Sequence, residues 1–164
     1  SIVLPGVGAF DTGVHKLKET GFWDAIKIFV EQEKKPILGI CLGMQLFFEK
    51  SQEGKEQGFS WLTAELIKFI PNDSLRVPHI GWERLNNTSN SLFSNSKDEF
   101  YFVHAYHAPN DLNVEYIIAS SSYGINFPAA FQKENITGFQ FHPEKSLNSG
   151  KQLLSRWYQS VTKK

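Results

Sequence analysis

The chain has 164 residues, of which 41% are hydrophobic and 14% aromatic, so we expect a globular protein and not a disordered one. Its 17 basic and 17 acidic residues balance, which removes any electrostatic reason to expect nucleic acid or an acidic membrane as partner. The single cysteine excludes an internal disulfide, and no apolar run approaches the roughly 18–20 residues of a membrane-spanning helix. These totals predict one domain over residues 1–164, located in the cytoplasm.

The first quarter of the chain alternates between strand and helix patterns. Residues 2–4 predict a short buried strand, which ends at the turn Pro5-Gly6-Val7-Gly8. Asp11 is expected to cap the helix that follows, and Pro36 to end a second helix and open the next strand. The apolar stripe expected on that second helix consists of Phe22, Ile26, Phe29 and Val30. Short links between strand, helix and strand favour parallel pairing.

The later part of the chain is richer in strand patterns. Expected strands cover residues 64–69, 100–104 and 116–119, and a hairpin joins 129–132 to 136–141. Residues 86–98 are rich in Ser and Asn and predict a surface loop. The apolar stripe of a last helix, beginning near Ser146, consists of Leu153, Leu154, Trp157, Tyr158 and Val161. The pattern predicts an α/β fold with a mostly parallel open sheet flanked by helices and a strand-rich C-terminal half.

The only cysteine lies between a predicted strand and a predicted helix, in the stretch Gly39-Ile40-Cys41-Leu42-Gly43. This Gly-x-Cys-x-Gly pattern is typical of a nucleophile elbow, because glycines at both ends let strand and helix pass close together. We expect Cys41 to point outward at the helix N-terminus, where free amides and the helix dipole favour the thiolate. The same amides could donate to an oxyanion.

A base for the thiol is expected at the far end of the sequence. His142 follows the predicted hairpin strand, and Pro143 stops that strand from pairing further. Glu144 lies two residues on, so its carboxylate can orient the imidazole. We therefore assign Cys41 as nucleophile, His142 as acid and base, and Glu144 as the orienting group.

Each of these motifs also has a purely structural interpretation. A lone buried cysteine is commonly an inert small hydrophobic residue, and a His-Pro-Glu sequence is commonly only a turn. The Pro5–Gly8 turn could bind phosphate but lacks the Gly-Lys-Ser/Thr ending, so it is better explained as a flexible part of an oxyanion hole. The histidines and the cysteine show no paired spacing, so no metal site is expected.

Three motifs together resemble class I glutamine amidotransferases: Leu4-Pro5-Gly6-Val7-Gly8-Ala9-Phe10, residues 39–45, and Gly138 to Ser146 with its Phe-His-Pro-Glu-Lys. Residues 77–82, Val-Pro-His-Ile-Gly-Trp, and 101–106, Tyr-Phe-Val-His-Ala-Tyr, narrow the likeness to the glutaminase subunits of imidazole glycerol phosphate synthase. The likeness covers essentially the whole chain in the right order.

The resemblance implies a reaction and a partner. Glutamine would be hydrolysed to glutamate and ammonia without a cofactor, and the ammonia would pass through a channel to a (β/α)8-barrel cyclase subunit in a heterodimer. The cyclase would use it to form imidazole glycerol phosphate in histidine biosynthesis. Two alternatives remain open: a paralogue that feeds a sugar amidotransferase in surface-polysaccharide synthesis, and a partner-binding module without catalysis.

The resemblance also assigns roles to further residues. Those expected to form the oxyanion hole or to bind substrate are Gly6, Val7, Gly8, Leu42, Gln45, Ala105 and Tyr106. Those expected on the synthase face are Trp82, Tyr101 and Lys145.

The sequence departs from the family pattern at several points. Ala105 stands where the family commonly has Ser or Thr, and Glu83 where Asn is common. The family's opening Asp-x-Gly-x-x-Asn-Leu signature is absent, so we expect an N-terminal strand and helix to be missing from this sequence.

Overall fold

A computed structural model of the chain describes residues 1–73, 75–86, 90–93 and 98–162. Its helices and strands are β1 (Ile2–Gly6), α1 (Phe10–Glu19), α2 (Phe22–Lys27), η1 (Ile28–Gln32), β2 (Ile37–Cys41), α3 (Leu42–Gln45), β3 (Phe48–Ser51), β4 (Leu62–Lys68), β5 (His79–Arg84), β6 (Glu99–His104), β7 (Tyr106–His107), η2 (Val114–Tyr116), β8 (Ile117–Tyr123), β9 (Ile125–Lys133), β10 (Ile136–Phe139), η3 (Pro143–Lys145) and α4 (Leu147–Thr162). Residues 87–89 and 94–97 of the expected surface loop lie outside the described part.

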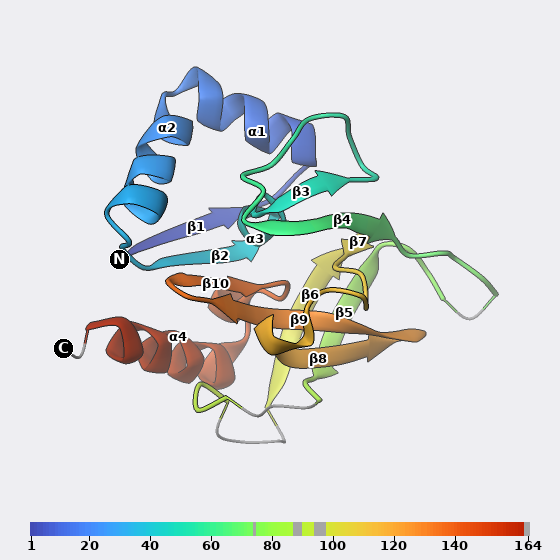
Figure 1. Cartoon of the computed structure of the whole chain (residues 1–164). Coiled ribbons are helices and arrows are strands. Elements are labelled where there is room, and N and C mark those ends of the chain that lie inside the picture. Colours follow the sequence, from blue (N-terminus) through green and yellow to red (C-terminus); the bar gives the residue numbers. More distant parts are fainter. Residues whose placement is uncertain (74, 87–89, 94–97, 163–164) are drawn as a thin grey trace.

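The central sheet has five strands in the order β1-β2-β10-β9-β8 (Figure 1). Strand β2 pairs in parallel with β1 on one side and with β10 on the other. Strand β9 runs antiparallel to both β10 and β8, and the expected β9–β10 hairpin is present. Two smaller sheets, β3-β4-β7 and β5-β6, lie beside it. The α/β class is confirmed. The central sheet has a parallel half, β1-β2-β10, and an antiparallel half, β10-β9-β8.

Two hydrophobic clusters cover the two faces of the central sheet. On β2, Ile37 joins the cluster under α1 and α2, whereas Leu38 and Ile40 join the cluster that includes Leu153 and Trp157 of α4. This alternation follows from the period of two along a strand. Figure 1 shows α1 and α2 on one side of the sheet and α4 on the other. Strands β2 and β10 are thus buried on both faces, as their apolar sequences require. Strand β1 lies at the edge of the sheet and its Val3 is 48% exposed, so the expected burial of residues 2–4 is wrong.

Two members of the predicted apolar stripes are exposed instead. Phe22 is the first residue of α2, one turn beyond the buried Ile26, and its exposed fraction is 60%. Tyr158 is 58% exposed because it lies about 100° around α4 from Trp157, at the outer edge of the buried stripe. The helices themselves were predicted correctly, but the width of each buried face was overestimated.

The expected helix cap at Asp11 is wrong. Asp11 lies inside α1, and its carboxylate accepts hydrogen bonds from the backbone amides of Lys55 (3.0 Å) and Glu56 (3.0 Å). The first amide of α1, at Phe10, is capped instead by Oε2 of Glu53 at 2.8 Å. The loop after β3 and the start of α1 therefore exchange carboxylates, and this exchange fixes the loop against the helix.

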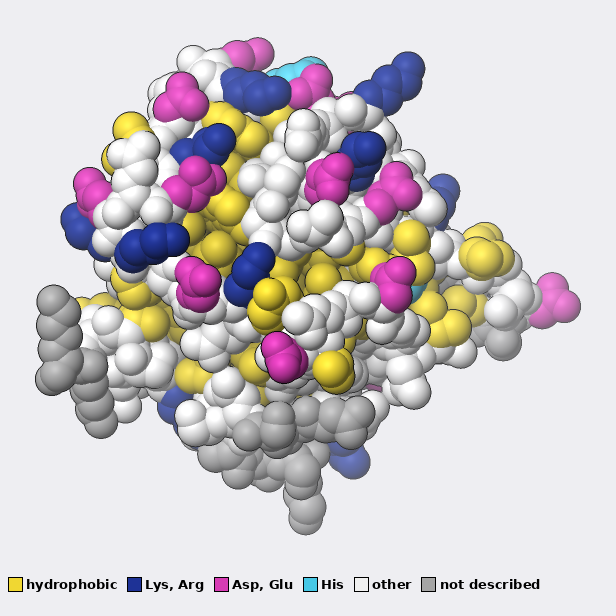
Figure 2. Space-filling model, viewed as in Figure 1, with side chains coloured by type: hydrophobic (Ala, Val, Ile, Leu, Met, Phe, Trp, Pro, Cys, Tyr) yellow, Lys and Arg dark blue, Asp and Glu magenta, His cyan; other side chains and the backbone are white. Residues whose placement is uncertain are grey.

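The molecular surface agrees with the balanced composition. On the face shown in Figure 2, acidic and basic side chains are interspersed, with hydrophobic side chains between them. Among the described residues, no helix has the length and apolar character needed to cross a membrane.

Candidate active site

Cys41 occupies a strained turn between β2 and α3. Its φ of 52° and ψ of −112° lie outside the regions that residues with a side chain normally adopt. A Cβ on Gly43 would lie 1.8 Å from the carbonyl oxygen of Leu4, and one on Gly39 would lie 2.6 Å from the ring of Phe47. Only glycine therefore fits at either position, and the predicted nucleophile elbow is present.

His142 lies three residues after the end of β10, the strand that pairs with β2, and β2 ends at Cys41. Strand β10 pairs with β2 in parallel, with Phe139 opposite Ile40, so both strands deliver their next residues to the same edge of the sheet. The His142 amide donates to the carbonyl oxygen of Tyr101 at 2.8 Å, which ties this segment to β6. Ser146 Oγ donates to the His142 carbonyl oxygen at 2.6 Å. The backbone that carries the imidazole is therefore held from two sides.

The imidazole of His142 is buried and oriented by a carboxylate. Its Nδ1 lies 2.6 Å from Oε1 of Glu144, whose side chain is 43% exposed. Its Nε2 has no hydrogen-bond partner among the described residues. This arrangement holds Nδ1 against the carboxylate and makes Nε2 the ring nitrogen that is free to act as acid and base.

Cys41 lines a pocket of about 270 Å³, and its sulfur donates to the Val103 carbonyl oxygen at 3.8 Å. The lining residues are Val7, Gly8, Cys41, Leu42, Gln45, Glu53, Val103, His104, Ala105, Tyr106 and Lys145. Most of the residues expected to bind substrate thus surround one space. Gly6 does not line it but ends β1 directly opposite Cys41 and borders an adjoining hollow.

The expectation that the helix end favours the thiolate is wrong for this structure. Burial raises the pKa of the Cys41 thiol to about 11, and the Leu42 amide only partly opposes it. The helix α3 has four residues, so its dipole is short, and Cys41 is 6% exposed. The sulfur is therefore a protonated thiol that needs a base.

Two residues near the sulfur were not assigned from the sequence. Gln140 Nε2 lies 4.0 Å from Cys41 Sγ, and Gln45 Nε2 donates to Gln140 Oε1 at 3.3 Å and to the Tyr106 carbonyl oxygen at 3.1 Å. Glu53, from the loop after β3, also lines the pocket, and its Oε2 accepts from the Phe10 amide. Gln140 could have been found as the residue two before His142, whereas nothing local in the sequence marks Glu53.

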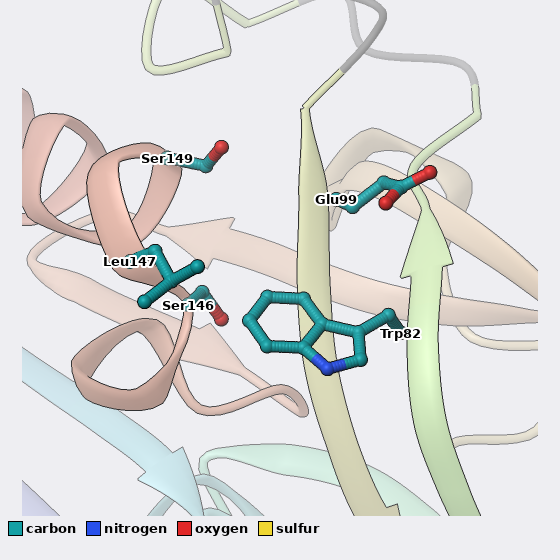
Figure 3. Close-up of a pocket in the computed structure, with 5 residues that line it drawn as sticks. All are labelled: Trp82, Glu99, Ser146, Leu147 and Ser149. Atoms are coloured by element: carbon teal, nitrogen blue, oxygen red, sulfur yellow. The ribbon is translucent and has the colours of Figure 1, made fainter.

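The residues expected on a partner face lie in a second region, at the junction of β5, β6 and α4. Trp82 and Tyr101 are cross-strand neighbours with ring centroids 5.7 Å apart. Lys145 Nζ lies 5.7 Å from the Tyr101 ring centroid and also lines the Cys41 pocket, so it links the two regions. Figure 3 shows Trp82 reaching from β5 across β6 toward Ser146 and Leu147, along a hollow of about 540 Å³.

In the described part of the chain, no three His, Cys, Asp or Glu side chains converge as a metal site would require.

Comparison with known proteins identifies the class. The family described as Glutamine amidotransferase class-I matches residues 1–160, so the chain belongs to that family. A crystal structure of a glutamine amidotransferase has the same fold, with a TM-score of 0.67 and 21% identity over 97% of this chain and 77% of that one.

Within that class the chain is similar to proteins named imidazole glycerol phosphate synthase subunit HisH. The Pseudomonas aeruginosa HisH 2 is 39% identical over 98% of this chain and 80% of its own length. The Carboxydothermus hydrogenoformans HisH is 46% identical over 93% of this chain and 76% of its own length. The resemblance drawn from the sequence motifs is thereby confirmed.

Proposed function

We propose that this chain is the glutaminase subunit of an imidazole glycerol phosphate synthase, with residues 1–164 acting as one amidotransferase domain. The observation that carries the proposal is that the strand ending at Cys41 and the strand leading to the His142–Glu144 pair run side by side in parallel, so both groups belong to the same edge of the sheet. The names of the HisH relatives support the choice of pathway.

The reaction begins with a proton transfer, because the Cys41 thiol is protonated at neutral pH. His142 Nε2 takes the thiol proton while the sulfur attacks the side-chain carbonyl carbon of glutamine and a C–S bond forms. The imidazolium, supported by Glu144, then protonates the leaving amide nitrogen. The C–N bond breaks and ammonia departs. Water, deprotonated by the same imidazole, hydrolyses the thioester and releases glutamate.

The negative charge on the tetrahedral intermediate needs two donors. The Leu42 amide stands at the elbow beside the sulfur. The second donor is an amide of the Val7–Gly8 segment, which lines the same pocket from the end of β1. Gly8 has φ +109°, so this segment can reorient in ways closed to other residues.

The amino-acid end of glutamine is held on the opposite side of the pocket. Gln45 and the backbone of Ala105 and Tyr106 supply polar groups there. The Glu53 carboxylate supplies the negative charge that an α-ammonium group requires. Because the Ala105 position offers only its backbone, no hydroxyl contact forms there.

The partner of the proposal is a (β/α)8-barrel cyclase subunit, bound as a heterodimer in the cytoplasm. The docking face is the region of Trp82, Tyr101 and Lys145, where Trp82 is 44% and Leu147 is 79% exposed. Ammonia must cross shielded from water, since protonation to ammonium removes the lone pair that attacks the acceptor. Lys145, which borders both regions, marks the expected exit from the pocket.

The proposal is tested by measuring ammonia and glutamate release from glutamine in the presence of the cyclase subunit and its substrate. We expect Cys41→Ala and His142→Ala each to lower turnover by at least about 10³-fold, with non-additive losses in the double variant. A glutamine-derived chloroketone should label the unmodified chain only at Cys41. Equal ammonia release from Cys41→Ala and the unmodified chain would refute the proposal.

A further inference from the structure

Two buried histidines face each other across the β5–β6 pair. His79 and His104 are cross-strand partners, and Nδ1 of His79 lies 3.1 Å from Nε2 of His104. His79 is fully buried and stacks on the Tyr123 ring at 3.9 Å. The other aromatic neighbours of the pair are Phe69, Phe102 and Phe127. An imidazole pair in such an apolar site costs free energy unless its nitrogens are hydrogen-bonded.

The hydrogen bonds fix the tautomer of each ring. Nδ1 of His104 lies 2.9 Å from the Tyr106 carbonyl oxygen, which can only accept, so this nitrogen carries the proton. Burial lowers the pKa of His104 to about 3 and that of His79 to about 4, so both rings are neutral at pH 7. Nε2 of His104 is then an acceptor, and His79 must donate to it from Nδ1.

The last nitrogen of the pair, Nε2 of His79, is left as an acceptor. It has no hydrogen-bond partner among the described residues, and the nearest acidic oxygen is Oε1 of Glu83 at 3.7 Å. Burial and the nearby Glu99 raise the pKa of Glu83. The direction of every proton in the pair is therefore set.

The carbonyl group that accepts from His104 also contacts a residue of the candidate active site. The Tyr106 carbonyl oxygen accepts from His104 and, at 3.1 Å, from Gln45 Nε2. Gln45 in turn contacts Gln140, whose amide nitrogen lies 4.0 Å from Cys41 Sγ. A continuous series of polar contacts thus joins β5 to the nucleophile through groups that are all buried or partly buried.

We propose that His79 and His104 are positioning residues for glutamine, which fix the Tyr106 carbonyl and, through it, the amide of Gln45. The proposal rests on the proposed function, because it assigns the pair to the substrate pocket of that reaction. Phenylalanine would fill the same aromatic site without any polar group, so packing does not account for two imidazoles there. A fixed carbonyl presents the substrate-binding groups in one geometry before substrate arrives.

The first test reads the tautomers directly. Long-range ¹H–¹⁵N spectra of the histidine side chains, recorded on the complex with the synthase subunit at pH 7, should show His79 and His104 neutral with the proton on Nδ1. Free neutral histidine favours the proton on Nε2, so this pattern is diagnostic. A proton on Nε2 of either ring, or an imidazolium, would overturn the proposal without reference to activity.

The second test separates positioning from stability. His79→Phe should raise the KM for glutamine about five- to tenfold with kcat changed less than threefold, because one hydrogen bond to the pocket network is lost. His79→Asn, whose amide can replace the Nδ1 donor, should restore KM to within about twofold of the unmodified complex.

The matched control is His107→Phe. His107 is equally buried and packs on Phe69 at 4.3 Å, but its Nδ1 bonds the Ala108 carbonyl oxygen, whereas His79 bonds His104. It should leave KM unchanged even where it lowers the melting temperature. An unchanged KM in His79→Phe with normal turnover would refute only the positioning role, whereas an unmodified complex that releases no ammonia would refute the proposed function.

Discussion

The two sides of the Cys41 pocket are built in opposite ways. The exposed loop consists of Val7 and Gly8. Val7 is 75% exposed, and a Cβ on Gly8 would have no neighbouring atom within 4 Å. The buried network consists of Gln45, His104, Tyr106 and Gln140, and the side chains of Gln45, His104 and Gln140 are each no more than 6% exposed.

The difference separates two tasks. Groups that recognise the substrate gain from being fixed in advance, because little order is then lost on binding. A donor that must be withheld until a partner is ready gains from a segment that can turn without repacking its neighbours. We infer that the buried network sets affinity for glutamine and that the exposed loop sets turnover.

The largest effect is expected from restricting the exposed loop. Gly8→Pro cannot adopt φ +109° and removes an amide, so kcat should fall about 10²–10³-fold while KM changes little. Steady-state glutaminase assays of the complex would measure both constants.

The control for that change is Gly21→Pro. Gly21 also has a positive φ, of 74°, and open space around it, but it lies between α1 and α2 away from the pocket. Its kcat should match that of the unmodified chain. A Gly8→Pro enzyme with full turnover would contradict the role given to the loop.

A second prediction concerns the sulfur that the buried network encloses. With its pKa at about 11 instead of 9.0, Cys41 should react with iodoacetamide at pH 8 about 100-fold more slowly than free cysteine, because each pKa unit removes about tenfold of thiolate. Mass spectrometry after timed quenching gives the rate, which should rise with pH up to about 11.

The raised pKa of Cys41 also makes the stability of the folded chain depend on pH. The folded chain keeps the thiol proton between pH 9 and 11, where the unfolded chain loses it, so the free energy of unfolding should fall across that interval. In the alkylation experiment, a rate that reaches half its maximum near pH 7 would contradict this pKa and show that the helix N-terminus affects the thiol more than burial does.

The smallest effect is expected at Glu144, which lies outside both regions. Its carboxylate is 43% exposed, so water can partly replace it beside His142. Glu144→Ala should lower kcat about tenfold, whereas Glu134→Ala, an exposed carboxylate in the β9–β10 turn, should have no effect. A loss at Glu144 as large as that at Gly8 would mean that orienting the imidazole matters more than the oxyanion donor.

Local patterns were sufficient for the elements that carry the chemistry. The elbow at Cys41 follows from apolar residues before a Gly-x-Cys-x-Gly turn, and the β9–β10 hairpin follows from two strand patterns joined by three turn residues. Each depends on residues within one or two turns of chain, where spacing limits the possible backbone conformations.

The wrong prediction of a helix cap at Asp11 has a different origin. Asp11 looked like a cap because it precedes a helical pattern, yet its carboxylate binds amides 44 and 45 residues away, and Glu53 takes its place at Phe10. Such exchanges depend on which loop packs over which helix. The sequence near Asp11 holds no information about that contact.

Residue types and spacing determined the α/β class, the elbow and the pairing of His142 with Glu144, and the resemblance of three motifs to known proteins gave the amidotransferase family. Only the tertiary structure decided that Cys41 is a protonated thiol, that Glu53 and Gln140 join its pocket, and that two histidines bond behind Tyr106. The physical reason is that burial and hydrogen-bond direction are set by neighbours brought together from distant parts of the chain, whereas backbone conformation at a turn is set by the residues of the turn itself.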